Sequence, residues 1–170
     1  MLGTDPLRNP EPLIKRVYAY VAYRIGDGAD AEDVTGDTFE RAWRYRKSFD
    51  PSRGEPIAWL LGIARRCIDD FFNQRRELLA DPPEPVAPGD VEEDTARRLR
   101  LAAAMSVLDE RERELIALRY GADLSAPQIG DLLELQSTAV RVALHRALGR
   151  LREALDETAA QPSSAIATPL

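Results

Sequence analysis

The side chains that could bind a ligand are mainly basic, and they recur about once per turn along residues 138–150. Arg141, Arg146 and Arg150 accompany His145 in this segment. Guanidinium groups on a helix can fork to guanine edges or neutralise phosphates. The predicted chemistry is therefore noncovalent recognition of a polyanion, such as the DNA duplex whose major groove admits an α-helix.

Groups suited to covalent catalysis are scarce. The single Cys and the single His, Cys67 and His145, lie far apart and cannot form a nucleophile–base pair unless the two halves of the chain dock. No Gly-rich phosphate loop and no Cys/His cluster for zinc is present in the sequence. We therefore expect no enzymatic activity, no catalytic residue, no metal and no cofactor.

Cysteine usage and hydropathy indicate a compartment. One Cys excludes an internal disulfide framework and is compatible with a reducing cytosol. No apolar stretch approaches the ~20 residues of a membrane span, and the N-terminus lacks an export signal. We expect a cytoplasmic protein without a membrane span.

The elements that must position the basic residues are predicted to be helices. Ser125 and Gln128 form a capping box with a proline in the first turn, so a short helix begins there. A tight turn at 134–136 leads to a longer helix over about 138–155. This order is typical of a helix-turn-helix motif. The alternative is an ordinary helical hairpin with a solvated arginine face.

The N-terminal half shows a second, weaker pattern. Trp59 and Phe72 are interleaved with arginines on one predicted helix, a composition that suits unstacked bases on a basic surface. Taken alone, the pattern favours the other interpretation, in which Trp59 belongs to the core and the arginines are solvated. The helices expected in this half cover 10–25, 30–47 and 56–76.

An acidic, proline-rich segment separates the halves. Residues 77–94 contain seven carboxylates, four prolines and no basic residue. Such a composition cannot bury enough apolar surface to fold alone. The segment carries a charge of −7, which accounts for the net charge of −6, because both flanking halves are close to neutral. Two modules on a tether can bind two separated sites on one long ligand.

The predicted fold class is all-α, with two small helical domains joined by a flexible acidic linker. Helical periodicity is strong throughout and strand signals are weak. The expected divisions are an N-terminal domain of three to four helices over 10–76, the linker 77–94, a helix-turn-helix domain over 95–155 and a disordered tail over 156–170.

Three blocks of sequence together resemble a known family. DAEDVTGDTFERAW (30–43) resembles the signature of extracytoplasmic-function (ECF) sigma factors of bacterial RNA polymerase, which are related to the primary sigma factor. PIAWLLGIARRCIDDFFNQRR (56–76) resembles the helix that follows it in that family, and 108–155 resembles the family's C-terminal helix-turn-helix. The resemblance covers about 10–155, in the family's order.

The resemblance implies a function and partners. The chain would bind core RNA polymerase, direct it to specific promoters and help melt them, with residues 10–76 as sigma region 2 and 95–155 as sigma region 4. Its partners would be the clamp of the largest polymerase subunit, the flap of the second-largest subunit, promoter DNA and an anti-sigma factor.

The resemblance also implies three sets of contact residues. The set for RNA polymerase is Asp33, Asp37, Thr38, Glu40 and Arg41. The set for the minus-ten promoter element is Ser52, Arg53, Trp59, Arg65, Arg66, Asn73 and Arg76. The set for the minus-thirty-five element is Ser137, Thr138, Arg141, Val142, His145, Arg146 and Arg150.

The chain departs from the family pattern at several positions. Glu134 stands in the helix-turn-helix turn where the family usually has Gly, and a left-handed non-Gly residue there costs ~1 kcal/mol. Val142 and Ala143 replace a small polar and a basic residue, which weakens phosphate contact and favours contact with a thymine methyl group. Arg66 replaces a common Asn, and Gly62 a common basic residue.

Two other functions remain compatible with the residues. One is a stand-alone helix-turn-helix regulator that binds a palindrome as a symmetric dimer. The other is a helical interaction protein that sequesters a transcription component without touching DNA.

Overall fold

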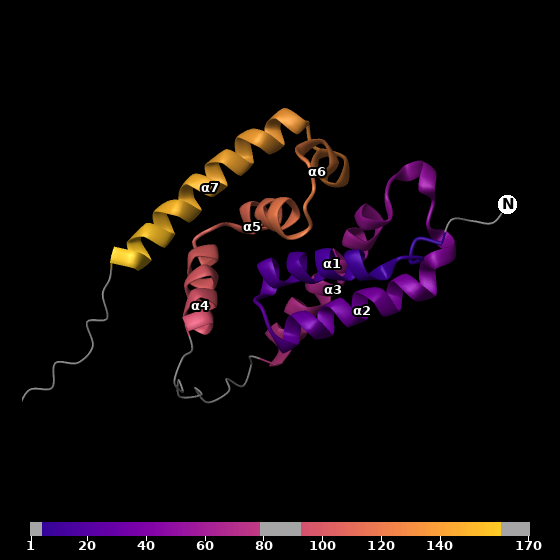
Figure 1. Ribbon diagram of the computed structural model, residues 1–170, viewed down its shortest axis with the longest axis horizontal. Helices are drawn as coiled ribbons and strands as arrows, with labels where there is room; N and C mark the ends of the chain where they lie inside the picture. The colour runs from indigo at the N-terminus through magenta and orange to yellow at the C-terminus, as the bar shows by residue number, and fades with distance from the viewer. Residues whose placement is uncertain (1–4, 79–92, 161–170) are drawn as a thin grey trace, which may run out of the picture.

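The computed structural model describes residues 5–78 and 93–160, and all the regular structure within them is helical, as the sequence predicts (Figure 1). None of the helices in these two ranges is both long and apolar enough to cross a membrane. The main helices are α1 (Pro10–Ile25), α2 (Ala29–Tyr45), α3 (Pro56–Leu78), α4 (Glu93–Ser106), α5 (Glu110–Ile116), α6 (Ala126–Leu133) and α7 (Ser137–Ala160).

The N-terminal half is a bundle of α1, α2 and α3, which all contact one another. Val17 and Val21 of α1 are buried against Leu60, Leu61 and Ile68 of α3 in one core. Two short 3₁₀ segments, η1 (Arg46–Ser48) and η2 (Pro51–Arg53), connect α2 to α3. Pro56 begins α3 at the first helical position, where its missing N–H is not needed.

The C-terminal half places α5 and α6 against α7. Reciprocal capping boxes begin α5, at Asp109 and Glu112, and α6, at Ser125 and Gln128. After α5 the chain continues as η3 (Ala117–Gly121), a π-helical turn whose Ala122 N–H donates to the Ala117 carbonyl at 2.9 Å. Rare π-turns of this kind frequently mark functional positions in helices.

The predicted ends of the linker and of the last helix shift. Helix α3 continues to Leu78 and α4 begins at Glu93, so residues 77–78 and 93–94 of the predicted linker are helical. The last helix continues to Ala160, so the prediction of disorder from 156 is wrong for residues 156–160. Its periodic apolar side chains reach Ala154, which is buried, and the helix extends beyond that contact. The remainder of the predicted tail, 161–170, and most of the linker, 79–92, lie outside the described residues.

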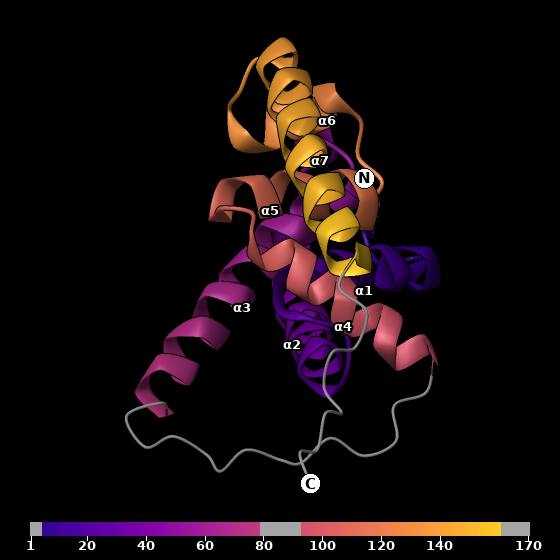
Figure 2. The same cartoon turned by 90° about the vertical axis from the view of Figure 1, so that its left-hand side faces the viewer.

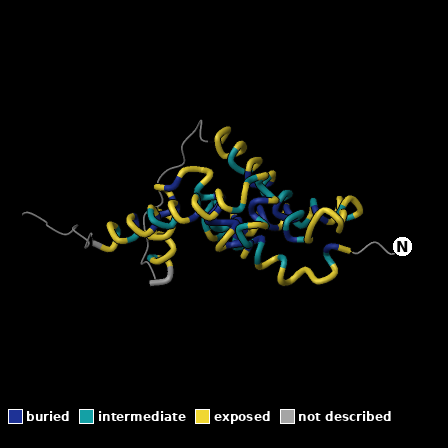
Figure 3. The backbone as a smooth tube through the Cα atoms, turned by 90° about the horizontal axis from the view of Figure 1, so that it is seen from above, coloured by how far each residue is buried: buried dark blue, intermediate teal, exposed yellow. Residues whose placement is uncertain are grey.

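The two halves are docked on each other rather than held apart. Figures 1 and 2 both show α6 and α7 on one side and α2 on the other, with α1 and α5 between them. Helix α1 packs against η3, and the buried side chains of both halves form one continuous cluster. Figure 3 shows this buried region in the middle of the molecule.

A buried hydrogen bond joins the halves at the centre of this cluster. Tyr20 of α1 is fully buried, and its hydroxyl lies 2.9 Å and 3.1 Å from the two carboxylate oxygens of Glu114 in α5. Burial raises the pKa of Tyr20 to about 12, because the charged phenolate is poorly solvated there. The neutral phenol is therefore the form that stabilises the docked fold.

We expect Tyr20→Phe to lower the free energy of unfolding at neutral pH by about 1.5–3 kcal/mol, the contribution of a hydrogen bond to a charged group. Because the folded pKa is raised, the wild-type advantage is complete below the ordinary pKa of 10.0 and is lost as pH rises through about 12. Urea unfolding of both proteins at several pH values checks this. Equal stability at neutral pH would contradict it.

Candidate nucleic-acid interface

The helix-turn-helix is built by α6, the turn and α7. Glu134 adopts the left-handed conformation, with φ 57° and ψ 44°, so the turn keeps its shape without the usual glycine. The next N–H, of Leu135, donates to the Gly130 carbonyl at 2.8 Å. A β-carbon at Gly130 would lie 2.5 Å from the Leu135 carbonyl oxygen, so this position of α6 accepts only glycine without rearrangement.

Helix α7 buries one side and exposes the other. Val140 and Ala147 are fully buried against the rest of the domain. Val142 on the other side is 51% exposed, an apolar group that a thymine methyl could contact. Most of the residues predicted for the minus-thirty-five element are exposed, namely Thr138, Arg141, Val142, His145 and Arg146, and Ser137 is half-buried at the start of the helix.

Arg150 is occupied within the domain. Its guanidinium donates to the Glu112 carboxylate at 2.7 Å and to the Val107 carbonyl at 2.8 Å. In this structure Arg150 therefore ties α7 to the start of α5, and its prediction as a DNA contact finds no support in its geometry.

In the N-terminal half, the loop before α3 and the first turns of α3 enclose a cavity of about 630 Å³. The Phe49 and Trp59 rings lie 5.6 Å apart at its wall, and Arg53 and Arg66 also line it. Ser52 shapes the loop, because its N–H and hydroxyl donate to Asp50 at 2.9 Å and 2.7 Å. These bonds lower the pKa of Asp50.

Helix geometry separates the predicted minus-ten residues. Trp59, Arg66 and Asn73 are seven residues apart and share one face of α3, which is exposed at Arg66 and Asn73. Asn73 lies roughly 21 Å along the helix from Trp59, at ~1.5 Å per residue, and neither it nor Arg76 lines the cavity. Seven-residue spacing thus identified a shared face but not a shared pocket.

Arg65 lies about 100° around α3 from Arg66 and faces the other half of the protein. Its Nε is 3.1 Å from a carboxylate oxygen of Glu114, and its side chain is 42% exposed. In this structure it pairs with the C-terminal half and does not line the cavity. The sequence could not show this, because the partner stands in a distant helix.

The acidic face of α2 carries most of the residues predicted to contact polymerase. Asp33, Asp37 and Glu40 are exposed, and half-buried Arg41 pairs with Asp70 of α3 at 2.7 Å. Thr38 is instead fully buried, and its hydroxyl donates to the Val34 carbonyl at 2.7 Å. Thr38 therefore has no surface to offer a partner, because its position on the wheel belongs to the apolar arc.

The sequence missed the residues of α6 that share the cavity of about 630 Å³. Gln128 and Asp131 of α6 line it together with Leu124, which precedes the helix, and the Gln128 side-chain nitrogen is 3.4 Å from the Glu55 carboxylate. It also missed Glu114, a carboxylate that is only 7% exposed. The one sequence feature that could have indicated its burial is its position directly before the apolar pair Leu115 and Ile116, which are both buried.

Among the described residues, no group of three or more His, Cys, Asp and Glu side chains is arranged to hold a metal ion. Cys67 is buried beneath the α2–α3 contact, and burial raises the pKa of its thiol. The arrangement is thus one of two surfaces that can bind, an aromatic–basic cavity on α3 and an exposed basic helix face on α7.

Known protein families match both halves. Sigma-70 region 2 matches residues 11–77, and sigma-70 region 4 matches residues 104–153. The ECF RNA polymerase sigma factor SigK of Mycolicibacterium vanbaalenii is 30% identical over 150 residues, covering 82% of this chain and 76% of the relative. BldN of Streptomyces coelicolor, also an ECF sigma factor, is 29% identical over 84% of this chain and 57% of its own length.

Two solved structures share the fold. Sigma factor RpoE of Bartonella quintana, in complex with the anti-sigma factor NepR, has a TM-score of 0.67 at 23% identity, covering 85% of this chain and 92% of its own. CnrH in complex with the cytosolic domain of CnrY has a TM-score of 0.63 at 27% identity, covering 88% and 84%.

Glu134→Gly should stabilise the protein, because glycine adopts the left-handed conformation without the ~1 kcal/mol that other residues lose. Part of this gain is offset by the greater freedom of glycine in the unfolded chain. We expect the thermal midpoint to rise by about 1–3 °C, measured by calorimetry. Glu134→Ala is the control and should bring no gain, and an unchanged midpoint for Glu134→Gly would show that the turn is unstrained.

Proposed function

The chain belongs to the ECF sigma factors, which direct RNA polymerase to promoters in transcription initiation, and we propose that its two surfaces divide promoter recognition between them. The cavity beside α3 receives the melted minus-ten element, and the exposed face of α7 reads the minus-thirty-five element. The proposal rests on the observation that two aromatic and two basic side chains line one cavity, namely Phe49, Trp59, Arg53 and Arg66.

A cavity with this lining suits a base taken out of the duplex. Aromatic rings provide stacking faces, worth ~1–3 kcal/mol per base, and the two arginines favour the phosphates beside it. The Asp50–Ser52 bonds hold the loop in shape before any ligand arrives, which reduces the entropy lost on binding. Differential binding of the melted strand over the duplex is how such a site promotes opening without catalysis.

The minus-thirty-five element is assigned to α7 because its outer face combines cationic and apolar groups. Arg141 and Arg146 supply guanidinium groups that can fork to guanine or neutralise phosphate. Val142, exposed between them, supplies an apolar contact. We leave Arg150 out of this set because its guanidinium is bonded to Glu112.

The docking site for core polymerase is assigned to the exposed acidic face of α2, formed by Asp33, Asp37 and Glu40, with Arg41 at its edge. Glu40 is paired with Arg44 of the same helix, so Asp33 and Asp37 present the uncompensated negative charge, which steers a partner of opposite charge and sets the orientation of docking. We propose that this face meets the clamp of the largest subunit and that the C-terminal domain meets the flap of the second-largest subunit.

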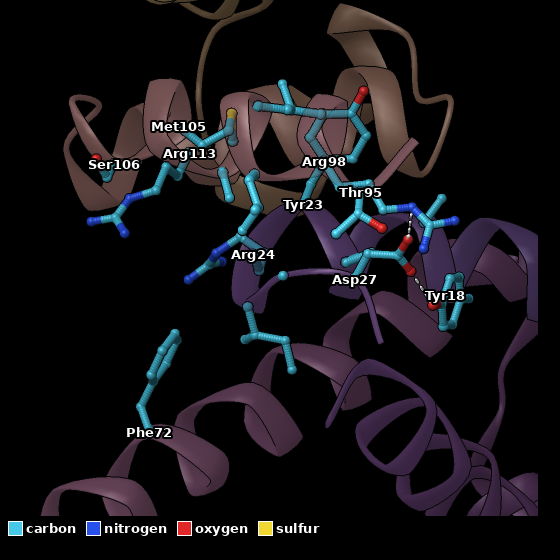
Figure 4. A pocket seen from close by; sticks show the side chains of 17 residues that line it. Tyr18, Tyr23, Arg24, Asp27, Phe72, Thr95, Arg98, Met105, Ser106 and Arg113 are labelled. Carbon is cyan, nitrogen blue, oxygen red and sulfur yellow. Dashed lines mark hydrogen bonds and ion pairs between the residues drawn. The ribbon is translucent and has the colours of Figure 1, made fainter. Parts of the chain in front are cut away.

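An anti-sigma factor is the further partner that we propose. A cavity of about 740 Å³ lies between α1, the end of α3 and α4. In Figure 4 Phe72 stands on one side, and Met105 and Arg113 on the other. Exposed Leu99 and Leu101 of α4 extend its apolar lining. An amphipathic helix with acidic flanks would match this apolar lining, and its carboxylates would exchange with Asp27 for the exposed Arg98 guanidinium, which pairs with Asp27 at 3.1 Å in this structure.

The test of the promoter assignment is run-off transcription by purified core polymerase on a library of upstream sequences. We expect protein-dependent transcripts that share two spaced elements. Trp59→Ala should abolish most of this activity while Trp59→Phe restores it, because phenylalanine keeps a stacking face. If Arg146 contacts a guanine, Arg146→Ala should weaken DNA binding by about 1–3 kcal/mol. If it contacts a phosphate, the plot of log binding constant against log salt concentration should become shallower by about 1.

Arg152→Ala is the matched control for Arg146→Ala, since Arg152 is an exposed arginine outside the proposed contact set and lies roughly 9 Å further along α7, at ~1.5 Å per residue. It should leave promoter selection unchanged. Duplex binding that ignores core polymerase would instead indicate a stand-alone regulator. Absence of both transcription and DNA binding would indicate a protein that sequesters a transcription component.

Leu99→Glu tests the anti-sigma site. The substitution replaces an exposed apolar side chain of α4 with a carboxylate, which removes an apolar contact and repels acidic groups. It should therefore reduce binding of an acidic amphipathic inhibitor at least about tenfold, the effect of ~1.4 kcal/mol. A two-hybrid screen with the full chain identifies inhibitors, and run-off transcription confirms that they block activity. An inhibitor that binds wild type and Leu99→Glu equally would place the site elsewhere.

A further inference from the structure

We propose that the cavity of about 740 Å³ between α1, the end of α3 and α4 binds a small amphipathic carboxylate, and that Arg113 of α5 receives its charged group. This is the cavity to which we assign the anti-sigma factor, but binding of a small acid requires neither that partner nor promoter DNA. The physical basis is an apolar lining, a buried donor without an acceptor and a wall that is fixed by ion pairs.

The lining of the cavity is largely apolar and incompletely covered. Phe72 and Tyr23 are half-buried in its wall, and Leu99 and Leu101 are 58% and 37% exposed. Sites for small ligands usually measure about 300–1,000 Å³ and combine apolar and aromatic side chains with a few polar groups. The size and the lining therefore both suit a small molecule, whose apolar part would remove these side chains from water.

Arg113 supplies the polar anchor of the site. Its Nε is buried and has no hydrogen-bond partner within residues 5–78 and 93–160. Buried donors are nearly always satisfied in native proteins, because their lost hydration must be replaced. The ion pair of the Arg113 Nη2 with Glu110 is long, at 3.9 Å. A carboxylate in the cavity would accept from Nε and a neighbouring Nη together, the paired geometry that guanidinium groups favour.

The other charged groups of the lining already have partners. Arg24 pairs with Glu114, and Arg98 pairs with Asp27 at 3.1 Å. Among the described residues that line the cavity, Arg113 is therefore the cation best placed to balance an incoming negative charge. A carboxylate carries one such charge. A phosphate group carries about 1.5–2 at pH 7 and would be poorly compensated beside Asp27, so the site favours a carboxylate.

The wall of the cavity is held in place before a ligand arrives. The Asp27 carboxylate, in the loop after α1, accepts from the Tyr18 hydroxyl and pairs with Arg98 of α4, and Figure 4 shows both contacts. In the same view Phe72 of α3 stands on the side opposite Arg113. A site that is formed in advance loses less entropy on binding than one that must be ordered by its ligand.

Binding of a small acid would change the response to the anti-sigma factor, a consequence that rests on the function proposed above. The inhibitor helix that we place at this cavity presents apolar and acidic side chains, so both ligands use one surface. A ligand that binds the free chain but not the inhibited complex shifts the equilibrium towards the free chain. The acid would therefore act as an inducer that releases the sigma factor from its inhibitor.

The first test titrates decanoate, below its micelle concentration, into the full chain by isothermal titration calorimetry. We expect saturable binding, with an affinity that rises about fourfold for each methylene added from octanoate to decanoate, the effect of burying one CH₂. Decanol has the same chain without the charge and should bind at least about tenfold more weakly. No saturable binding of decanoate, or equal binding of decanol, overturns the proposal.

Arg113→Gln tests the anchor. It should weaken decanoate binding at least about tenfold and leave decanol binding unchanged, because it removes the charge but not the apolar lining. Arg111→Gln is the matched control, since Arg111 is an exposed arginine of α5 that does not line the cavity. It should leave the binding of both ligands unchanged. Equal losses of decanoate binding in the two variants would contradict the proposal.

Ala102→Phe tests the cavity independently of charge. Ala102 is exposed on α4 and lines the cavity, so a phenylalanine there fills part of the volume. It should weaken decanoate and decanol alike at least about fourfold, the loss of one buried methylene. Ala103→Phe is the control, because Ala103 is exposed on the same helix outside the lining. Circular dichroism confirms that each variant is folded, and full affinity in folded Ala102→Phe overturns the proposal.

Binding to the chain alone and displacement of an inhibitor separate this proposal from the anti-sigma assignment. Decanoate binding that depends on Arg113 but leaves an inhibitor bound would support the ligand site and place the anti-sigma factor elsewhere. Loss of inhibitor binding in Leu99→Glu, without decanoate binding to wild type, would overturn the ligand site while leaving the anti-sigma assignment in place.

Discussion

The arrangement of this protein depends on one buried carboxylate. Glu114 lies between the halves, where Arg24 and Arg65 of the N-terminal bundle pair with its charge and the neutral Tyr20 hydroxyl donates to it. In other proteins, removing one partner from a buried ion pair destabilises by about 3–5 kcal/mol, because the remaining charge is left without compensation. A charge placed in this way contributes little to net stability but favours one relative orientation of the two domains.

That orientation decides what each surface can do. The face of α3 that holds Trp59 and Arg66 is open to the loop on one side and meets α6 on the other. The outer face of α7 remains exposed in the same state. The two surfaces that we propose to bind DNA therefore differ in access, and the difference arises from the contact of α1 with η3 rather than from either domain alone.

Local sequence determined most of the fold. The capping boxes at Asp109 and Ser125 are visible as short motifs, and the structure contains both. The helical class, the helix-turn-helix order and the sigma-factor family were likewise predictable, because periodicity, caps and family motifs act over a few residues. The left-handed conformation of Glu134 follows from the turn length, although its residue type argues against it.

What the sequence by itself determined is the set of helices and the side chains that each one carries. The tertiary structure alone decided that Arg65 faces Glu114 rather than the cavity, and that Arg150 bonds within its own domain. The physical reason is the sequence separation between the residues that contact each other. A helix wheel gives the angle of a side chain about its own axis, but the identity of its partner depends on elements 30 to 100 residues away, whose placement is set by packing of the whole chain.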